Sequence, residues 1–163
     1  MAIGQAFDND GPWPLVLWGA AGVGKSYAMA LLYQRTPLHA FWYRLEEFVS
    51  DIMTCRREGS VSKSINGGAV FSRTEFKLWE YAANSRAVWC LDDFGTRKLT
   101  PAGFEVVFRL IDLRQKSPTI ITTNLKPEAI EGMYDARIAS RILGGTVVEV
   151  TGEDRRKGVR VRA

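Results

Sequence analysis

The sequence predicts a three-layer α/β/α sandwich built on a five-stranded parallel sheet. Short apolar or β-branched runs alternate with longer segments of helical periodicity, which is typical of such a fold. A length of 163 residues suits one domain with a full core and leaves little room for a second. We therefore expect a single domain over residues 1–163, with an N-terminal extension at 1–11 and a basic C-terminal tail at 152–163.

The five strands are predicted where apolar residues run without interruption. They are expected at residues 15–18, 40–44, 88–91, 119–123 and 146–150. Helices are expected between them, at 25–34, 46–57, 72–83 and 101–115, with short helices broken near Gly132 within 124–140.

Local signals support two of these helix starts and one loop. Ser72 followed by Glu75 has the spacing of a capping box, and Thr100 followed by Pro101 is a cap with proline at the first helical position. The segment 59–68 is rich in Ser, Gly and Lys, which predicts a flexible loop.

The bulk composition excludes some classes of function. No apolar run approaches the roughly 20 residues that span a bilayer, so we expect no membrane partner. The two cysteines, Cys55 and Cys90, lack the spacing of a disulfide or metal framework, which favours a reducing, cytoplasmic setting. The net charge of +4 permits contacts with nucleic-acid phosphates, although a solvated basic face is the simpler interpretation.

The strongest motif follows the first predicted strand. It reads Gly19-Ala20-Ala21-Gly22-Val23-Gly24-Lys25-Ser26, a full match to the phosphate-binding loop G-x-x-x-x-G-K-[ST] in a strand–loop–helix context. Its backbone N–H groups would cradle ATP phosphates, Lys25 would reach the β- and γ-phosphates, and Ser26 would ligate Mg²⁺. Tyr27, the next residue, completes the expected nucleotide-binding segment.

Two carboxylates end the predicted strand at 88–91. Open α/β sheets bind ligands at the carboxyl ends of their strands, so Asp92 is a candidate Mg²⁺ ligand and Asp93 a candidate base for the attacking water. The simpler alternative is a solvated acidic turn. Asn124 ends the next strand and would contact the γ-phosphate or this water, or else cap the following helix.

Together these motifs resemble a known group, the AAA+ ATPases related to bacterial helicase loaders (DnaC-like) and transposition helpers (IstB-like). The matching pieces, in the order of the family, are residues 19–26, Leu91-Asp92-Asp93-Phe94-Gly95, 120–125, Arg137-Ile138-Ala139-Ser140-Arg141-Ile142 and 152–156. They extend from about residue 12 to residue 157. The resemblance implies an AAA+ sheet without a C-terminal helical lid, and an ATPase that associates with copies of itself.

The resemblance also implies roles for particular arginines. Arg141 matches the family's arginine finger, which completes the site of a neighbouring subunit, and Arg137 lies one helical turn earlier. Arg156 matches an arginine that senses the nucleotide. The alternative for the helical pair is weak ion pairing on a solvated surface.

In loader-like proteins, single-stranded DNA runs along the elements after the second strand. The matching basic residues here are Arg56, Arg57 and Lys63. The implied function is that of a DNA-replication accessory ATPase that assembles on single-stranded DNA and serves a replicative helicase. The alternatives are a transposition helper that binds duplex DNA and a transposase, and a nucleotide-gated adaptor with little turnover.

Overall fold

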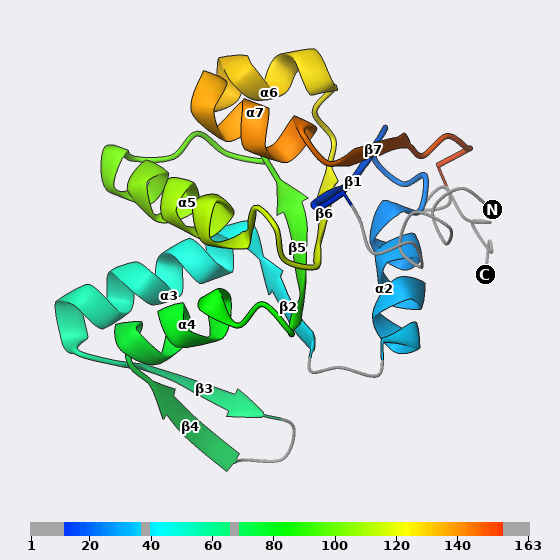
Figure 1. The fold of residues 1–163 in the computed structure, drawn as a ribbon. Coiled ribbons are helices and arrows are strands. Elements are labelled where there is room, and N and C mark those ends of the chain that lie inside the picture. The colour runs from blue at the N-terminus through cyan, green and yellow to red at the C-terminus, as the bar shows by residue number, and fades with distance from the viewer. Residues whose placement is uncertain (1–11, 37–39, 66–68, 155–163) are drawn as a thin grey trace, which may run out of the picture.

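A central parallel sheet organises the structure, a computed structural model that describes residues 12–36, 40–65 and 69–154. In spatial order, its strands are β2 (Ala40–Arg44), β5 (Val88–Phe94), β6 (Thr119–Thr123), β1 (Leu15–Trp18) and β7 (Thr146–Glu149). All four neighbouring pairs are parallel (Figure 1). The predicted fold class, a five-stranded parallel sheet between helical layers, is confirmed.

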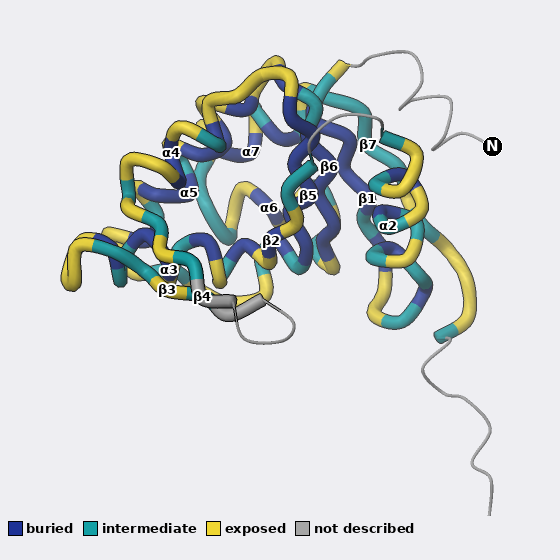
Figure 2. Tube along the Cα trace, turned by 90° about the horizontal axis from the view of Figure 1, so that it is seen from below, coloured by how far each residue is buried: buried dark blue, intermediate teal, exposed yellow. Residues whose placement is uncertain are grey.

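Helices cover both faces of this sheet. Their bounds are α2 Lys25–Arg35, α3 Leu45–Glu58, α4 Glu75–Ala83, α5 Pro101–Arg114, α6 Pro127–Met133 and α7 Ala136–Leu143. Side chains alternate across a strand, so Leu15 and Leu17 pack toward α2 while Val16 joins the larger cluster under α3, α4, α5 and α7. Figure 2 shows the resulting buried centre along β1, β5 and β6. Along the described chain, no helix is both long and apolar enough to cross a membrane.

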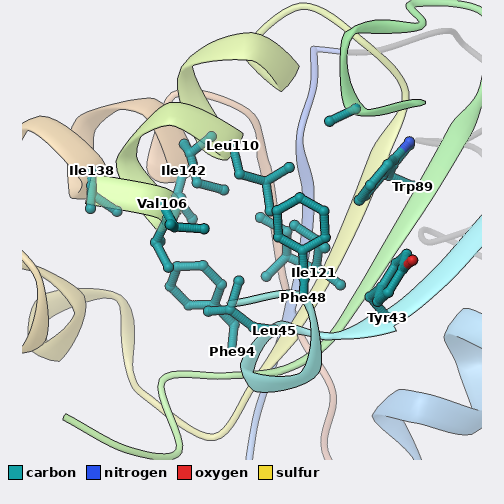
Figure 3. Packing of buried hydrophobic residues seen from close by; sticks show 14 of the residues in the cluster. Tyr43, Leu45, Phe48, Trp89, Phe94, Val106, Leu110, Ile121, Ile138 and Ile142 are labelled. Carbon is teal, nitrogen blue, oxygen red and sulfur yellow. The ribbon is translucent and has the colours of Figure 1, made fainter. Parts of the chain in front are cut away.

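Aromatic rings fill the larger cluster. Trp89 on β5 is fully buried and stacks on Tyr43 of β2, with ring centroids 5.6 Å apart. Phe48 of α3 meets Trp89 edge-on at 5.5 Å, and Figure 3 shows these three side chains converging between sheet and helix. Such pairs add to the stabilisation from buried area, and they fix α3 against the sheet edge formed by β2.

The prediction of a flexible loop at 59–68 is wrong for residues 61–65, and residues 66–68 lie outside the described residues. Val61–Ile65 forms β3, which pairs antiparallel with β4 (Ala69–Arg73) in a separate two-stranded sheet. Val61 packs against the main core, and this long-range contact is absent from the local composition that predicted a loop. The Ser- and Lys-rich sequence is that of a strand with exposed positions such as Ser62.

The predicted capping box is also displaced. Ser72 belongs to β4, where it pairs with Ser62, and α4 begins at Glu75. Its cap is Thr74, whose hydroxyl accepts the Lys77 N–H at 3.4 Å. Strand pairing therefore overrides the local capping signal at Ser72. The cap at Thr100 is confirmed, since its hydroxyl accepts a backbone N–H from α5 at 3.2 Å.

Arg114, at the end of α5, is a buried cation that ties the amino ends of β5 and β6 to α4. It is 1% exposed. Its guanidinium donates to Thr119 Oγ1 at 3.1 Å, Ala82 O at 3.2 Å, and Asn84 O, Ala87 O and Pro118 O at 2.7 Å each. Burial lowers the pKa of Arg114 to about 10, which leaves it charged at neutral pH.

We expect Arg114→Met to lower the free energy of unfolding by at least about 3 kcal/mol, because several buried carbonyls lose their donors. Urea unfolding followed by circular dichroism measures this loss. The matched control is Arg97→Met at a side chain that is 80% exposed, for which we expect a change within about 0.5 kcal/mol. Equal stability of the two variants would contradict the structural role of Arg114.

Candidate functional site

The glycine-rich loop joins β1 to α2 and is held by both neighbours of β1. The Gly19 N–H donates to Thr123 O of β6 at 3.3 Å, and Val150 N–H donates to Trp18 O at 2.7 Å. The Val150 carbonyl oxygen occupies the space that a Cβ on Gly19 would need. Only glycine therefore allows the chain after β7 to pack this closely against the loop.

Helix α2 begins inside the site. Its N-cap is Gly24, which has a φ of 102° and no side chain to accept the first N–H groups of the helix. These donors and the positive end of the helix dipole favour an anion at this point. A cavity of about 250 Å³ opens here, lined by Ala21, Gly22, Gly24, Lys25, Ser26, Tyr27, Asp93 and Asn124. The structure thus brings together predicted residues from three separate motifs.

Lys25 is buried against the loop that contains it. Its ammonium donates to Gly19 O at 2.9 Å, Ala20 O at 2.7 Å and Asn124 Oδ1 at 2.6 Å. The first two bonds hold the loop closed around the lysine. The third reaches across to the end of β6, so the positive charge lies where the loop, α2 and β6 meet.

Asp92 links three elements through one oxygen atom. Its Oδ1 accepts the Ser26 hydroxyl of α2 at 2.8 Å and also the Thr122 hydroxyl of β6. Asp92 is 7% exposed, so these bonds replace the water that its carboxylate loses on burial. The alternative interpretation of a solvated acidic turn is wrong for Asp92.

Thr122 is a site residue that the sequence analysis missed. Its hydroxyl donates to Asp92 and accepts the Asp93 N–H at 3.1 Å, so one side chain fixes both aspartates. Threonine is common in strands for its β-branched shape, which hid this role. The signal in the sequence that could have identified Thr122 is a hydroxyl residue near the end of the strand that follows the aspartate pair.

Asp93 lies at a break in the strand pairing. The register between β5 and β6 shifts between Leu91 and Phe94, and Asp93 has a φ of 57° in the left-handed region. Aspartate tolerates this conformation better than most residues. The bulge turns Asp93 into the cavity while Asp92 stays buried beside Ser26.

The spacing of Ser26 and Asp92 fits a magnesium ion that also binds phosphate. Adjacent oxygen ligands of an octahedral Mg²⁺ lie about 2.9 Å apart, and Ser26 Oγ lies 2.8 Å from Asp92 Oδ1. Among the described residues, no group of three or more His, Cys, Asp or Glu side chains is placed to hold a metal. Mg²⁺ characteristically takes one or two protein ligands and completes its shell with phosphate oxygens and water.

Asn124 points into the cavity and does not cap a helix. Helix α6 begins after Lys126, and no side chain caps it. The capping alternative is therefore wrong, and the Asn124 carbonyl oxygen instead accepts from Lys25.

Arg141 and Arg137 lie apart from this cavity. Both guanidinium groups stand 4.9 Å from the ring centroid of Phe108, which confirms that they share a helix face. Arg141 also donates to Asp112 at 2.9 Å and to the Arg137 carbonyl oxygen at 2.9 Å. Within this chain, Arg141 is therefore held on α7 by partners that do not line the cavity.

The two arginines expected to contact DNA end α3 and differ in their surroundings. Arg56 pairs with Glu75 at 3.0 Å, and its side chain is 38% exposed. Arg57 pairs with its neighbour Glu58 at 2.7 Å, and its side chain is 74% exposed. Exposed ion pairs of this kind are weak, so the guanidinium of Arg57 remains available to bind other anions.

Lys63 is more firmly held. Its ammonium lies 2.6 Å from Asp51 Oδ2, whose side chain is 9% exposed, and 5.2 Å from the ring centroid of Tyr43. The pair attaches β3 to α3. Arg156, the predicted nucleotide-sensing residue, lies outside the described residues.

Solved structures share this fold. AMPPCP-bound DnaA from Aquifex aeolicus superposes with a TM-score of 0.72 and 15% identity, over 95% of this chain and 46% of that one. The DnaC helicase loader gives 0.71 and 19%, over 92% and 86%. A replication initiator DnaA bound to AMPPCP and single-stranded DNA gives 0.70 and 16%, over 93% and 44%. The chain thus spans less than half the length of either DnaA chain.

The sequence itself also matches a family. A comparison with curated proteins found no match. Residues 10–163, however, match the family described as IstB-like ATP binding protein. This range includes the glycine-rich loop, both aspartates, Asn124 and Arg141. Because the match covers nearly the whole chain, the protein belongs to the IstB-like ATP-binding family.

Proposed function

We propose that this protein hydrolyses ATP to ADP and phosphate in a Mg²⁺-dependent reaction. One observation carries the proposal: Ser26, Asp92 and Asp93 meet beside the buried ammonium of Lys25. A protein that only binds nucleotide has little use for a second carboxylate beside the one that holds the metal. Its presence in the cavity favours hydrolysis over a nucleotide-gated adaptor.

Each side chain has a role that follows from its position. Lys25 binds the β- and γ-phosphates, exchanging its bond to Asn124 for phosphate oxygens. Ser26 and Asp92 hold Mg²⁺, which when bound neutralises developing charge on the phosphates. Asp93 orients the attacking water and accepts its proton. Asn124 contacts this water or the γ-phosphate from the end of β6.

Lys25→Ala should weaken ATP binding by at least about tenfold, because a charge-assisted hydrogen bond to phosphate is lost. Isothermal titration calorimetry with ATP and Mg²⁺ measures the affinity. Thermal unfolding of the variant tests whether the loop carbonyls that Lys25 binds tolerate the change. A folded variant with unchanged ATP affinity would place the nucleotide elsewhere.

We further propose that the active site is completed by Arg141 of a neighbouring copy. Arg141 matches the arginine-finger motif, and it lies on α7 away from the nucleotide cavity of its own chain. The Asp112 carboxylate and the Phe108 ring orient its guanidinium. Such an arginine stabilises transition-state charge without being needed for nucleotide binding.

Arg141→Ala should therefore keep ATP affinity while lowering turnover on the order of a hundredfold. Mixing it with Asp93→Asn should partly restore phosphate release, because a mixed interface combines an intact Asp93 with an intact Arg141. Arg137→Ala, on the same helix face, is the matched control and should retain more activity. Failure of any mixture to regain activity would argue against a shared site.

The larger role that we propose is that of a DNA-replication accessory ATPase of helicase-loader type, assembling on single-stranded DNA. The fold is shared with the DnaC helicase loader and with a DnaA bound to single-stranded DNA. The exposed arginines that end α3 supply phosphate contacts, most strongly Arg57. The family match keeps a second candidate, a transposition helper that binds duplex DNA and a transposase.

Arg57→Ala should weaken binding to single-stranded DNA and reduce the slope of log affinity against log salt by about one. Fluorescence anisotropy with a labelled oligonucleotide at several salt concentrations measures both. Arg86→Ala, at an exposed position before β5, is the control. Tighter binding to duplex would favour the transposition helper, and binding insensitive to salt would contradict a DNA partner.

A further inference from the structure

We propose that Asp154 recognises the ribose hydroxyls of the bound nucleotide. This inference rests on the proposed function, because it assigns a residue to the nucleoside end of the same site. Asp154 follows β7 and was not among the site residues expected from the sequence.

The first observation is contact with the phosphate-binding loop. Gly22 has a φ of 82°, and a Cβ built on it would lie 3.2 Å from the Asp154 Cβ and would overlap the Asp154 carboxylate. Gly22 itself lines the nucleotide cavity. The Asp154 carboxylate therefore occupies the space beside the loop that a side chain at Gly22 would fill.

The segment that precedes Asp154 also packs against the glycine-rich loop, which restricts where Asp154 can lie. The carbonyl oxygen of Val150 packs against Gly19, and the Val150 N–H donates to Trp18 O at 2.7 Å. The chain thus leaves β7 along the surface of the loop and reaches Gly22 four residues later. Contacts at both ends fix the course of residues 150–154.

Strand order then decides which end of the nucleotide faces Asp154. The sheet runs β5-β6-β1-β7, so the loop after β1 has β6 and β5 on one side and β7 on the other. In the proposed reaction, Asp93 and Asn124, at the ends of β5 and β6, act at the γ-phosphate. The nucleoside must then extend toward the opposite side, where the segment after β7 carries Asp154.

The negative charge of the Asp154 carboxylate limits which groups of the nucleotide it can bind. An ionised carboxylate only accepts hydrogen bonds, and phosphate oxygens repel it. The ribose, joined directly to the phosphates, carries two hydroxyl donors. A ligand hydroxyl that donates to an ionised side chain gives discrimination, because an analogue without that hydroxyl makes one charge-assisted hydrogen bond fewer.

The test measures equilibrium binding rather than turnover. Calorimetric dissociation constants are compared for ATP, 2′-deoxy-ATP and 2′,3′-dideoxy-ATP. We expect the unmodified protein to bind ATP at least about tenfold more tightly than the dideoxy analogue. Asp154→Ala should bring this ratio close to one, mainly by weakening ATP binding. Asp154→Asn, nearly equal in shape, keeps the test valid if the alanine variant misfolds.

Glu153→Gln is the matched control, since it removes a charge from the exposed neighbouring residue and should leave the ratio unchanged. An unchanged ratio in the folded Asp154 variants would overturn the assignment. So would an equal gain in affinity for all three nucleotides, which would show that Asp154 only repels phosphate. If the unmodified protein binds no nucleotide at all, the proposed function itself fails.

Discussion

The carboxylate of Asp92 is the interaction on which the site depends, because it joins β5 to α2 and to β6. Asp92 is buried where water cannot stabilise its charge, so the hydroxyls of Ser26 and Thr122 must supply its hydrogen bonds. Those bonds fix the start of α2 relative to two strand ends. They also hold Ser26 and Asp92 at the separation of adjacent magnesium ligands.

The opposite end of the sheet supplies the rigidity that this arrangement needs. Arg114 binds carbonyl oxygens where β5 and β6 begin, while the ring of Trp89 fills the core between them and α3. Between these points β5 and β6 are buried almost throughout, so their side chains are closely packed on both faces of the sheet. The polar side chains of the site, Asp92, Asp93 and Asn124, lie at the carboxyl ends of β5 and β6, where a sheet of this order binds its ligand.

Charge on the surface is arranged differently from charge in the site. All three expected DNA contacts have acidic partners within the chain, and Lys63 in particular attaches β3 to α3 through the buried Asp51. A basic residue held by a buried partner loses much of its attraction for phosphate. The exposed Arg57 is a better candidate, a distinction that net charge alone does not make.

Local spacing and burial pattern were enough to predict the fold class, the phosphate-binding loop and the aspartate pair. Features that depend on contacts between distant segments could not be predicted in this way, because those contacts exist only in the folded chain. The pairing of β3 with β4 replaces half of a predicted loop with a strand, and the Lys25 contact gives Asn124 a place in the cavity. Thr122 and Asp154 became candidates for the same reason, since Thr122 contacts the aspartate pair from β6 and Asp154 contacts the loop from the side of β7.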